Sequence, residues 1–392
     1  MKSKVSLSTL LPVLFSFYIV GFCDIIGISV NYVQNDFQLS DTIAGLFPAV
    51  VFIWFLFFSA PVATLANKIG CKRMVLYGML LIVLGMFVPF FMYNLLGCFV
   101  TFVMLGIGNV ILQVTLNPLL ACVVSSHALS ATLTSTQLIK GISAFCGPFL
   151  SAFTMSFWGY WHYVFPIFGV IALISAFWLL FTSVKVTSIC TYATFSESFA
   201  LLKDYHILLL FLSIVCAVGI DVGMNVCIPK LMMIRCGHTI QDAALSSSVY
   251  FAFRTLGVFV GTILLINLSE LKYLRIHVLL MLIAAFLLLF AEGEYFILTL
   301  AGMVGFGCSS IFTVICSIAL KSYSDKVNKV SVLMMMGICG GAFVPFLMGV
   351  VLDYVGSMVV ALMVVIACMF CLLYCSFGFP TGYFIRKREA LI

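Results

Sequence analysis

Long apolar runs occupy most of this 392-residue chain and constrain its fold more than any motif does. A helix needs about 20 apolar residues to cross the hydrocarbon core of a bilayer. Twelve runs reach that length, and they lie near residues 8–32, 42–66, 74–93, 96–123, 129–156, 163–183, 205–230, 242–267, 275–291, 295–320, 329–351 and 357–378. The sequence therefore predicts an all-α membrane protein with twelve transmembrane helices.

Composition indicates the same class of protein. Hydrophobic residues make up 64% of the chain and charged residues only 8%, whereas a soluble domain carries roughly a quarter charged residues. Such a chain cannot cover a water-facing surface, so the lipid bilayer is its expected surrounding. The first apolar run is too long for the core of a signal peptide and lacks a small-residue cleavage site, so we expect it to remain as a span.

The basic residues predict the orientation, because cytoplasmic loops of membrane proteins are enriched in Lys and Arg. With both termini in the cytoplasm, 15 of the 19 Lys and Arg residues fall in cytoplasmic segments, namely Lys2, Lys4, Lys68, Lys72, Arg73, Lys185, Lys203, Lys272, Arg275, Lys321, Lys326, Lys329, Arg386, Lys387 and Arg388. The opposite loops hold Lys230 and Arg235 beside Asp36, Asp41, Glu292 and Glu294. The net charge of +6 follows from this bias, so no nucleic-acid partner is expected.

Enzyme chemistry has no recognisable site in the sequence. The phosphate-binding pattern GxxxxGK(S/T) is absent, and none of the five histidines joins a carboxylate or nucleophile in a known constellation. The CxxC pair of Cys368 and Cys371 lies inside an apolar run without a histidine nearby, where thiols behave as small hydrophobic groups. We therefore expect no catalytic residues, no metal site and no cofactor.

Two pairs of similar segments indicate an internal duplication. The run GISAFCGPFLSAF from Gly141 resembles GICGGAFVPFLMG from Gly337, and VGFCDIIGIS around Asp24 resembles VGIDVGMNV around Asp221. Both pairs relate one span to the span six positions later. A parallel duplication of a six-helix half is typical of the major facilitator superfamily, whose halves rock about a site near the bilayer midplane.

This duplication divides the chain into two pseudo-symmetric six-helix halves, residues 1–183 and 205–392, joined by a cytoplasmic linker of residues 184–204. The loop after the second span reads ATLANKIGCKR and resembles the Gly-x-x-x-Asp-Arg-x-Gly-Arg-Arg-like motif of the superfamily. Gly70 and the basic Lys72 are kept there, whereas Asn67 replaces the acid of the motif.

Four segments, in the right order along the whole chain, resemble the fucose–proton symporter family. Span eleven reads GGAFVPFLMGVVLD from Gly340, span eight contains FRTLGVFVG with Arg254, and span four contains LQVTLNPLL with Asn117. Span five has Gln137 and Lys140 where the family has Gln-x-x-Asn. The resemblance implies an importer of a monosaccharide or related sugar, driven by protons and active as a monomer. A bacterial inner membrane is its expected location.

Two departures concern the coupling ion. The acid that family members carry in span four is Gln113 here, and the span-one acid of the fucose transporter falls about one helical turn from Asp24. A facilitator or a sodium-coupled carrier is therefore an alternative to proton symport. A sensor that binds a solute without carrying it is a further alternative, from a different class of protein.

Four charged residues are expected deep inside spans: Asp24, Lys140, Asp221 and Arg254. A charge at the bilayer centre costs at least ~2.5–3.5 kcal/mol, so each should be buried in the bundle and paired. From their depth we expect Lys140 to pair with Asp24, either as a structural salt bridge or as a gate that opens when Asp24 is protonated. Asp221 and Arg254 are candidates for proton coupling or gating too, although a structural role is the favoured interpretation of their expected pair.

Amide side chains suggest where a solute binds. Asn109, Gln113 and Asn117 recur every fourth residue in span four, which places them on one stripe of a helix. Sugar hydroxyls need such donors and acceptors, although hydrogen bonding between helices is an alternative use of the amides. The candidate solute-binding residues are Asn109, Gln113, Asn117, Gln137, Lys140 and Asn225, with Trp54 as a possible stacking face.

Overall fold

The computed structural model describes residues 7–124, 126–184 and 194–379 of the chain. Part of the predicted linker lies outside these ranges, as do Lys2, Lys4, Lys185, Arg386, Lys387 and Arg388. The described residues form α-helices and short 3₁₀ segments, and no strand occurs among them. Twelve helical spans are long and apolar enough to cross a membrane, which confirms the predicted fold class.

The first six spans are joined by short connections. They are α1 (Leu7–Val20) continued by η1 (Gly21–Ile25) and α2 (Ile26–Asp36); α3 (Asp41–Phe52) with α4 (Trp54–Ile69); α5 (Cys71–Phe91); α6 (Leu95–Val123); α7 (Ser126–Trp158); and η2 (Trp161–Tyr163) with α8 (Val164–Phe181).

The last six spans follow the short segments α9 (Phe195–Phe199) and η3 (Ala200–Lys203). They are α10 (Tyr205–Cys236); α11 (Ile240–Asn267); α12 (Glu270–Leu288); α13 (Glu294–Cys308) with α14 (Ile311–Ser322); η4 (Ser324–Lys326), α15 (Val327–Met336), η5 (Gly337–Cys339) and α16 (Gly340–Val355); and α17 (Met358–Phe377). Helix α10 continues past the predicted end of its span, so Lys230 and Arg235 lie in a helix and not in the loop where they were predicted.

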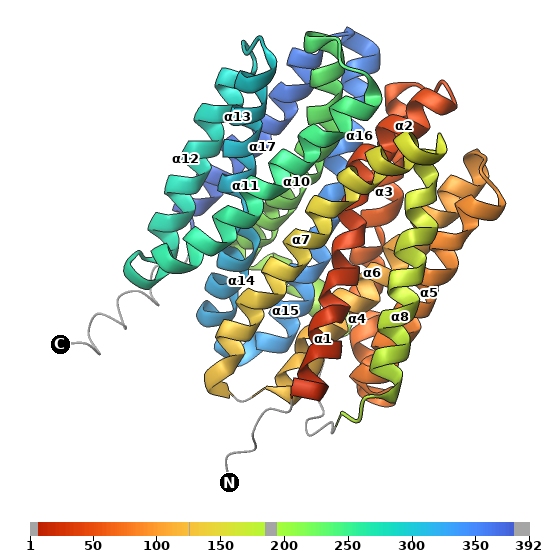
Figure 1. Ribbon diagram of the computed structural model, residues 1–392. Helices are drawn as coiled ribbons and strands as arrows, with labels where there is room; N and C mark the ends of the chain where they lie inside the picture. The colour runs from red at the N-terminus through yellow and green to blue at the C-terminus, as the bar shows by residue number, and fades with distance from the viewer. Residues whose placement is uncertain (1–6, 125, 185–193, 380–392) are drawn as a thin grey trace.

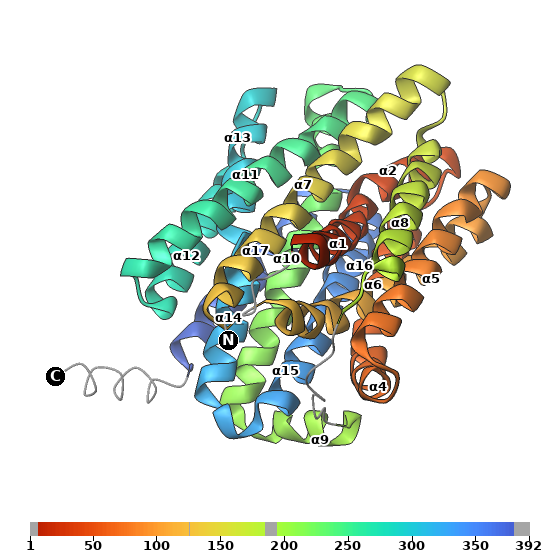
Figure 2. The ribbon, with the colours of Figure 1, turned by 60° about the horizontal axis from the view of Figure 1, so that its bottom comes forward.

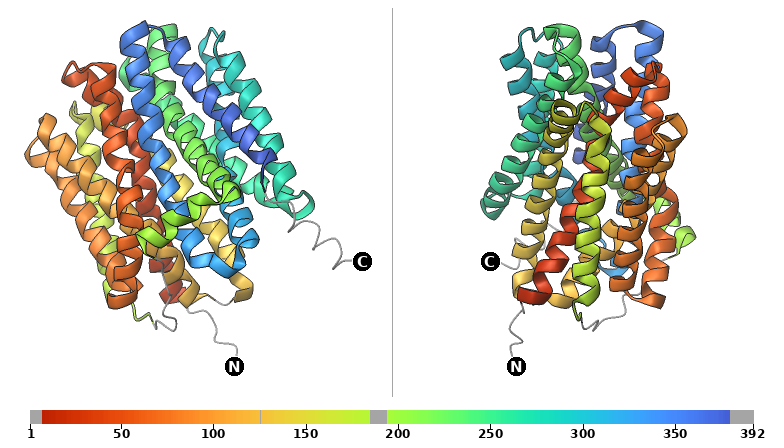
Figure 3. Two further views of the ribbon diagram at one scale, coloured as in Figure 1. Left: turned by 180° about the vertical axis from the view of Figure 1, so that it is seen from behind. Right: turned by 45° about the vertical axis from the view of Figure 1, so that its right-hand side comes forward.

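The first six and the last six spans form two groups that lie side by side (Figure 1). Helix α7 packs along α11 on the side of the bundle that faces the viewer in Figure 1, and α3 packs along α16 on the opposite side, which the view from behind shows (Figure 3). These two seams relate the fifth span to the eighth and the second to the eleventh. The short helix α9 lies across one end of the bundle (Figure 2).

Charged residues distinguish the two ends of the bundle. The basic end holds the start of α1 together with Lys68, Lys72, Arg73 and Lys321. The acidic end holds Asp36, Asp41, Glu292 and Glu294.

The turn between α4 and α5, at the basic end, depends on a glycine. Gly70 has φ of 92°, a left-handed conformation that side chains with a Cβ rarely adopt. Two residues later, the Lys72 ammonium donates hydrogen bonds to the carbonyl oxygens of Leu180 at 3.0 Å and Thr182 at 2.7 Å. The lysine thereby satisfies carbonyls at the end of α8 that have no partner within that helix.

Four spans depart from a regular α-helix partway across the bundle. The first has the 3₁₀ segment η1, the second a turn at Ile53, the tenth a turn at Ser309–Ser310, and the eleventh the 3₁₀ segment η5. Irregular backbone is tolerated at membrane depth where it is buried in protein or lines a cavity. These breaks therefore direct attention to the centre of the bundle, where Asp24 lies within η1.

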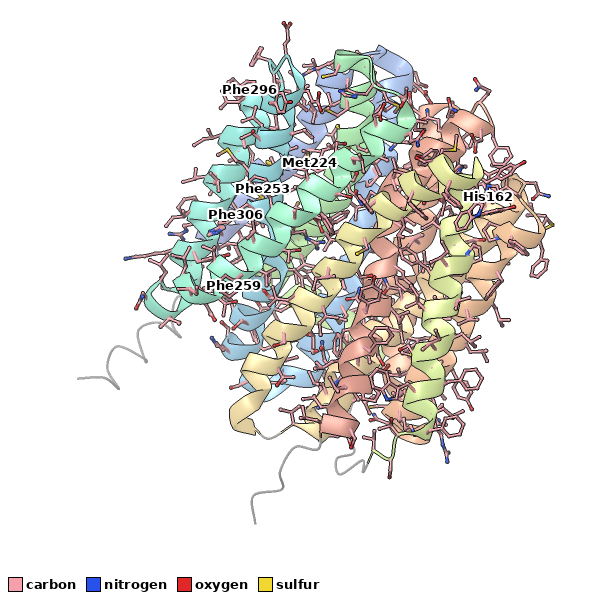
Figure 4. All side chains as sticks on the ribbon, in the orientation of Figure 1. His162, Met224, Phe253, Phe259, Phe296 and Phe306 are labelled. Carbon is pink, nitrogen blue, oxygen red and sulfur yellow. The ribbon has the colours of Figure 1, made fainter. Side chains whose placement is uncertain are left out.

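Phenylalanines serve both lipid contact and helix packing. Phe259 on α11 and Phe296 on α13 are exposed, and they lie toward the basic and the acidic end respectively (Figure 4). Phe253 packs instead against Gly302 of α13. A Cβ placed on Gly302 would lie 2.8 Å from the Phe253 ring, so the glycine makes room for this contact. The aromatic content therefore does not by itself mark a binding site.

Candidate transport site

A buried cavity lies among the central helices, and both groups of six spans contribute to its wall. It offers about 120 Å³ to the centres of water-sized molecules, whereas roughly 10–15 Å³ is enough for one water. The cavity therefore has room for several waters or a small solute.

The two acids and the arginine predicted inside spans meet in this cavity. Arg254 Nη2 lies 2.7 Å from Asp221 Oδ2, and Arg254 Nη1 lies 3.3 Å from Asp24 Oδ2. Tyr250 donates a hydrogen bond of 2.7 Å to the other carboxylate oxygen of Asp221. One guanidinium thus holds two carboxylates, and we call Asp24, Asp221 and Arg254 the charged trio.

The trio confirms one predicted pair and corrects the other. Asp221 does pair with Arg254. The predicted pair of Asp24 and Lys140 is wrong, because Asp24 pairs with Arg254 and no ion pair joins Lys140 to an acid within the described part of the chain. The prediction treated the first span as a straight helix, and it overlooked that a forked guanidinium can serve two carboxylates at once.

Amides and a lysine form the other polar part of the wall. Asn109, Gln113 and Asn117 on α6 line the cavity together with Gln137 and Lys140 on α7. The side chain of Asn109 is 1% exposed, and neither of its amide atoms has a hydrogen-bond partner among the described residues. A buried polar group without a partner is costly, so a solute that reaches this amide would gain a hydrogen bond with it.

Two predicted residues lie elsewhere. Asn225 does not line the cavity in this structure, and its Nδ2 donates to the Asp24 carbonyl oxygen at 2.8 Å, so its contact with a solute stays a prediction. Trp54 also lies outside the wall and packs edge-on against Phe58.

The aromatic residues that do line the cavity are Phe17, Phe52 and Phe312. Sequence reasoning missed them because nothing in their local pattern separates them from the other phenylalanines of the chain, 39 in all.

A second, larger cavity continues from the first. It has a volume of about 670 Å³ and shares Asn117, Gln137, Phe312, Thr313 and Met335 with the central cavity. Its remaining wall reaches Ile266 and Leu320, at the basic ends of α11 and α14. The central site therefore communicates with the basic end of the bundle.

Polar contacts close the acidic end between the two groups of spans. The Lys230 ammonium binds the carboxylate of Asp41, and it lies 3.0 Å from Gln34 Oε1. The Asp353 carboxylate accepts hydrogen bonds from the backbone N–H groups of Asp41 at 2.9 Å and Thr42 at 2.7 Å, at the start of α3. We call these contacts the acidic-end latch. The central cavity therefore opens toward the basic end, while the acidic-end latch covers the opposite side.

Residues 10–269 match the family model described as Major Facilitator Superfamily. The chain belongs to the Major Facilitator Superfamily. It is an integral, multi-pass membrane protein of a transporter family, and the twelve spans with a central cavity are the architecture expected of that superfamily.

Curated and solved relatives extend the comparison. The "Glucose/galactose transporter" of Brucella abortus, in strain 9-941 and in strain 2308, is 22% identical over 396 residues, which cover 92% of this chain and 90% of the relative. A variant of the E. coli fucose:proton symporter FucP matches in structure with a TM-score of 0.68, and FucP in the outward conformation with 0.67. Both are 18% identical and are covered to 99%, with 95% of this chain aligned. These structures show the fold that the chain shares.

Proposed function

We propose that this protein is a secondary active transporter, and not an enzyme, that imports a monosaccharide or related sugar by proton symport. The observation that carries the proposal is the buried cavity in which amides from two helices face a charged trio. The names of the relatives support a sugar, since they are a glucose/galactose transporter and a fucose:proton symporter.

The wall of the cavity suits a sugar in two ways. Asn109, Gln113, Asn117 and Gln137 offer both donors and acceptors to hydroxyl groups. Phe52 and Phe312 supply apolar faces for the C–H groups of a pyranose ring. Such a combination of apolar lining and a few convergent polar groups is what a small-molecule site requires.

Coupling is assigned to the charged trio together with Lys140. Protonation of Asp24 weakens its hold on Arg254, and this contact joins the first six spans to the last six. Asp221 keeps the guanidinium in place. Lys140, in the same wall, is free to stabilise whichever acid remains charged or to bind the solute.

Alternating access is proposed to move residues 1–183 against residues 205–392, with 184–204 as the linker. The basic end is assigned to the cytoplasm because Lys and Arg gather there, which places both termini in the cytoplasm and makes this structure inward-facing. A bacterial inner membrane and function as a monomer complete the proposal.

A facilitator or a sodium-coupled carrier is the second candidate, favoured by Gln113 at the position where the fucose–proton symporter family has an acid. A sensor of the same fold would bind a sugar without moving it.

Uptake by proteoliposomes separates these candidates. Labelled monosaccharides and related sugars are offered with and without an inward proton gradient, and with a sodium gradient as a parallel arm. Accumulation driven by protons is the expected result. Equal uptake with and without each gradient identifies a facilitator, and sodium-driven accumulation identifies a sodium-coupled carrier. Absence of exchange between labelled and unlabelled sugar, despite binding, identifies a sensor and contradicts the proposal.

A further inference from the structure

The charges in the cavity are divided unequally between its two polar parts. The charged trio contains two carboxylates and one guanidinium, which leaves it with one net negative charge. The amide wall contains one cation, Lys140. The four groups together are neutral, but the lysine is not in contact with an acid in the described part of the chain.

The position of Lys140 matters because a half-buried cation deep inside a span is costly without a counter-charge. Both acids in the cavity already bind Arg254, whose fork of donors holds them more firmly than a point charge does. Gln137 lies one turn before Lys140 on α7, and Asn109, Gln113 and Asn117 line the same cavity. The lysine is thus surrounded by groups that bind hydroxyls, and it is the one cation of the cavity that is available to a solute.

Charge balance then distinguishes a neutral solute from an anionic one. When an acid of the trio takes up a proton, the four groups gain one net positive charge. A neutral sugar leaves that charge in place when both ends of the carrier close around the site during transport, and an isolated buried charge is strongly disfavoured. A sugar with one carboxylate restores neutrality, so the loaded carrier has the same net charge as the empty one.

We propose that the solute is a monoanionic sugar acid, such as a hexuronate, whose carboxylate binds Lys140 while its hydroxyls bind the amides of α6 and Gln137. This inference rests on the proposed function, because it names the kind of sugar that the same site takes.

Competition and uptake measurements on the purified full-length protein test it. Glucose, galactose, glucuronate and galacturonate are compared in wild type, Lys140→Gln and Lys140→Arg. A hexuronate is expected to bind at least ten-fold more tightly than the matching hexose. Lys140→Gln is expected to weaken hexuronate binding about 10- to 100-fold, and at least ten-fold more than it weakens hexose binding, since a charge-assisted contact is lost only from the anion. Lys140→Arg keeps the charge and is expected to retain the preference for the anion.

Membrane voltage supplies a second readout in wild type, where no variant has to fold. One proton moving with one anion carries no net charge, so hexuronate uptake is expected to be insensitive to voltage. Voltage-driven uptake of hexuronate would contradict the proposal that one proton and one anion cross together without net charge. Uptake of hexoses in preference to hexuronates, unaffected by Lys140→Gln, overturns the inference and leaves sugar transport standing. Failure to take up either kind of sugar overturns the proposed function as well.

Discussion

Arg254 Nη1 lies 3.3 Å from Asp24 Oδ2, so an ion pair in the central cavity joins the eighth span to the first. The same guanidinium lies 2.7 Å from Asp221 Oδ2 on the seventh span. Because one cation serves two acids, neutralising one acid leaves the arginine paired with the other. This arrangement allows a proton to alter the contact between the two groups of spans without leaving a buried cation unpaired.

Asp24→Asn tests whether that contact carries the coupling proton. The variant keeps the shape of the side chain and removes its titration, so we expect exchange of labelled for unlabelled sugar to remain while accumulation is lost. A gradient of about one pH unit can concentrate a solute about ten-fold at one proton per sugar. The variant should only equalise the sugar concentrations inside and outside the vesicles. Asp325→Asn, at an exposed acid of the basic end, is the matched control and should accumulate like wild type. Full accumulation by Asp24→Asn would place the coupling proton on another group.

Arg254→Gln tests the structural role of the trio. Removing the guanidinium leaves the carboxylates of Asp24 and Asp221, 13% and 18% exposed, without their cation, and stranding fully buried charges in this way costs about 3–5 kcal/mol, which is an upper bound here. We expect a clearly lower unfolding temperature in detergent than for Lys68→Gln, which changes an exposed lysine.

The double variant Arg254→Gln/Asp221→Asn sharpens this test, because it removes one of the stranded charges. We expect it to recover part of the stability lost in Arg254→Gln. Equal stability of Arg254→Gln and the exposed control would show that the trio contributes nothing to folding.

The spans and the amide stripe could be predicted because they depend on local patterns. A run of about 20 apolar residues marks a span wherever it packs. Asn109, Gln113 and Asn117 share one stripe of any α-helix at their spacing. The structure places all three in the cavity wall.

The ion pairs depend on tertiary structure and were only half predicted. Whether Arg254 or Lys140 meets Asp24 is decided by the 3₁₀ segment η1 and by how α11 approaches it, and neither is encoded in nearby residues. Lys230 was predicted at the start of a loop, yet it lies in α10 with Asp41 as its partner from another span. Phe312 has no local feature that distinguishes it from a lipid-facing phenylalanine.

The acidic-end latch is expected to stabilise the state seen here. Asp353→Asn removes a negative charge from the start of α3, where the backbone N–H groups of Asp41 and Thr42 point at it. We expect the population to shift about 3- to 10-fold toward the state that opens at the acidic end.

Thiol labelling in oriented vesicles measures that shift. Thr313→Cys places a thiol where the two cavities join, in a background whose other cysteines are replaced by alanine. Asp353→Asn should slow labelling by a membrane-impermeant reagent added at the basic end and speed it at the acidic end. Asp325→Asn should change neither rate. Unchanged rates in Asp353→Asn would mean that the latch has no part in holding the acidic end closed.

Asn109 and Asn31 provide a matched pair that separates solute binding from structure. Both asparagines are buried, at 1% and 3% exposure. Asn31 Nδ2 donates to the carbonyl oxygens of Gly27 at 2.9 Å and Val226 at 3.1 Å, whereas the amide of Asn109 has no partner among the described residues. Asn31→Leu is therefore expected to lower the free energy of unfolding by about 1–3 kcal/mol.

Asn109→Leu is expected to lower the affinity for the solute and to spare the stability of the fold. It removes an amide that has no partner in the folded protein and that a bound solute would satisfy. We expect its stability to stay within about 1 kcal/mol of wild type or to rise, while solute affinity falls about ten-fold or more. Unfolding in detergent and equilibrium binding of the best transported sugar measure the two effects on the same preparations. A loss of stability in Asn109→Leu as large as in Asn31→Leu, with affinity unchanged, would assign Asn109 to helix packing and remove it from the binding site.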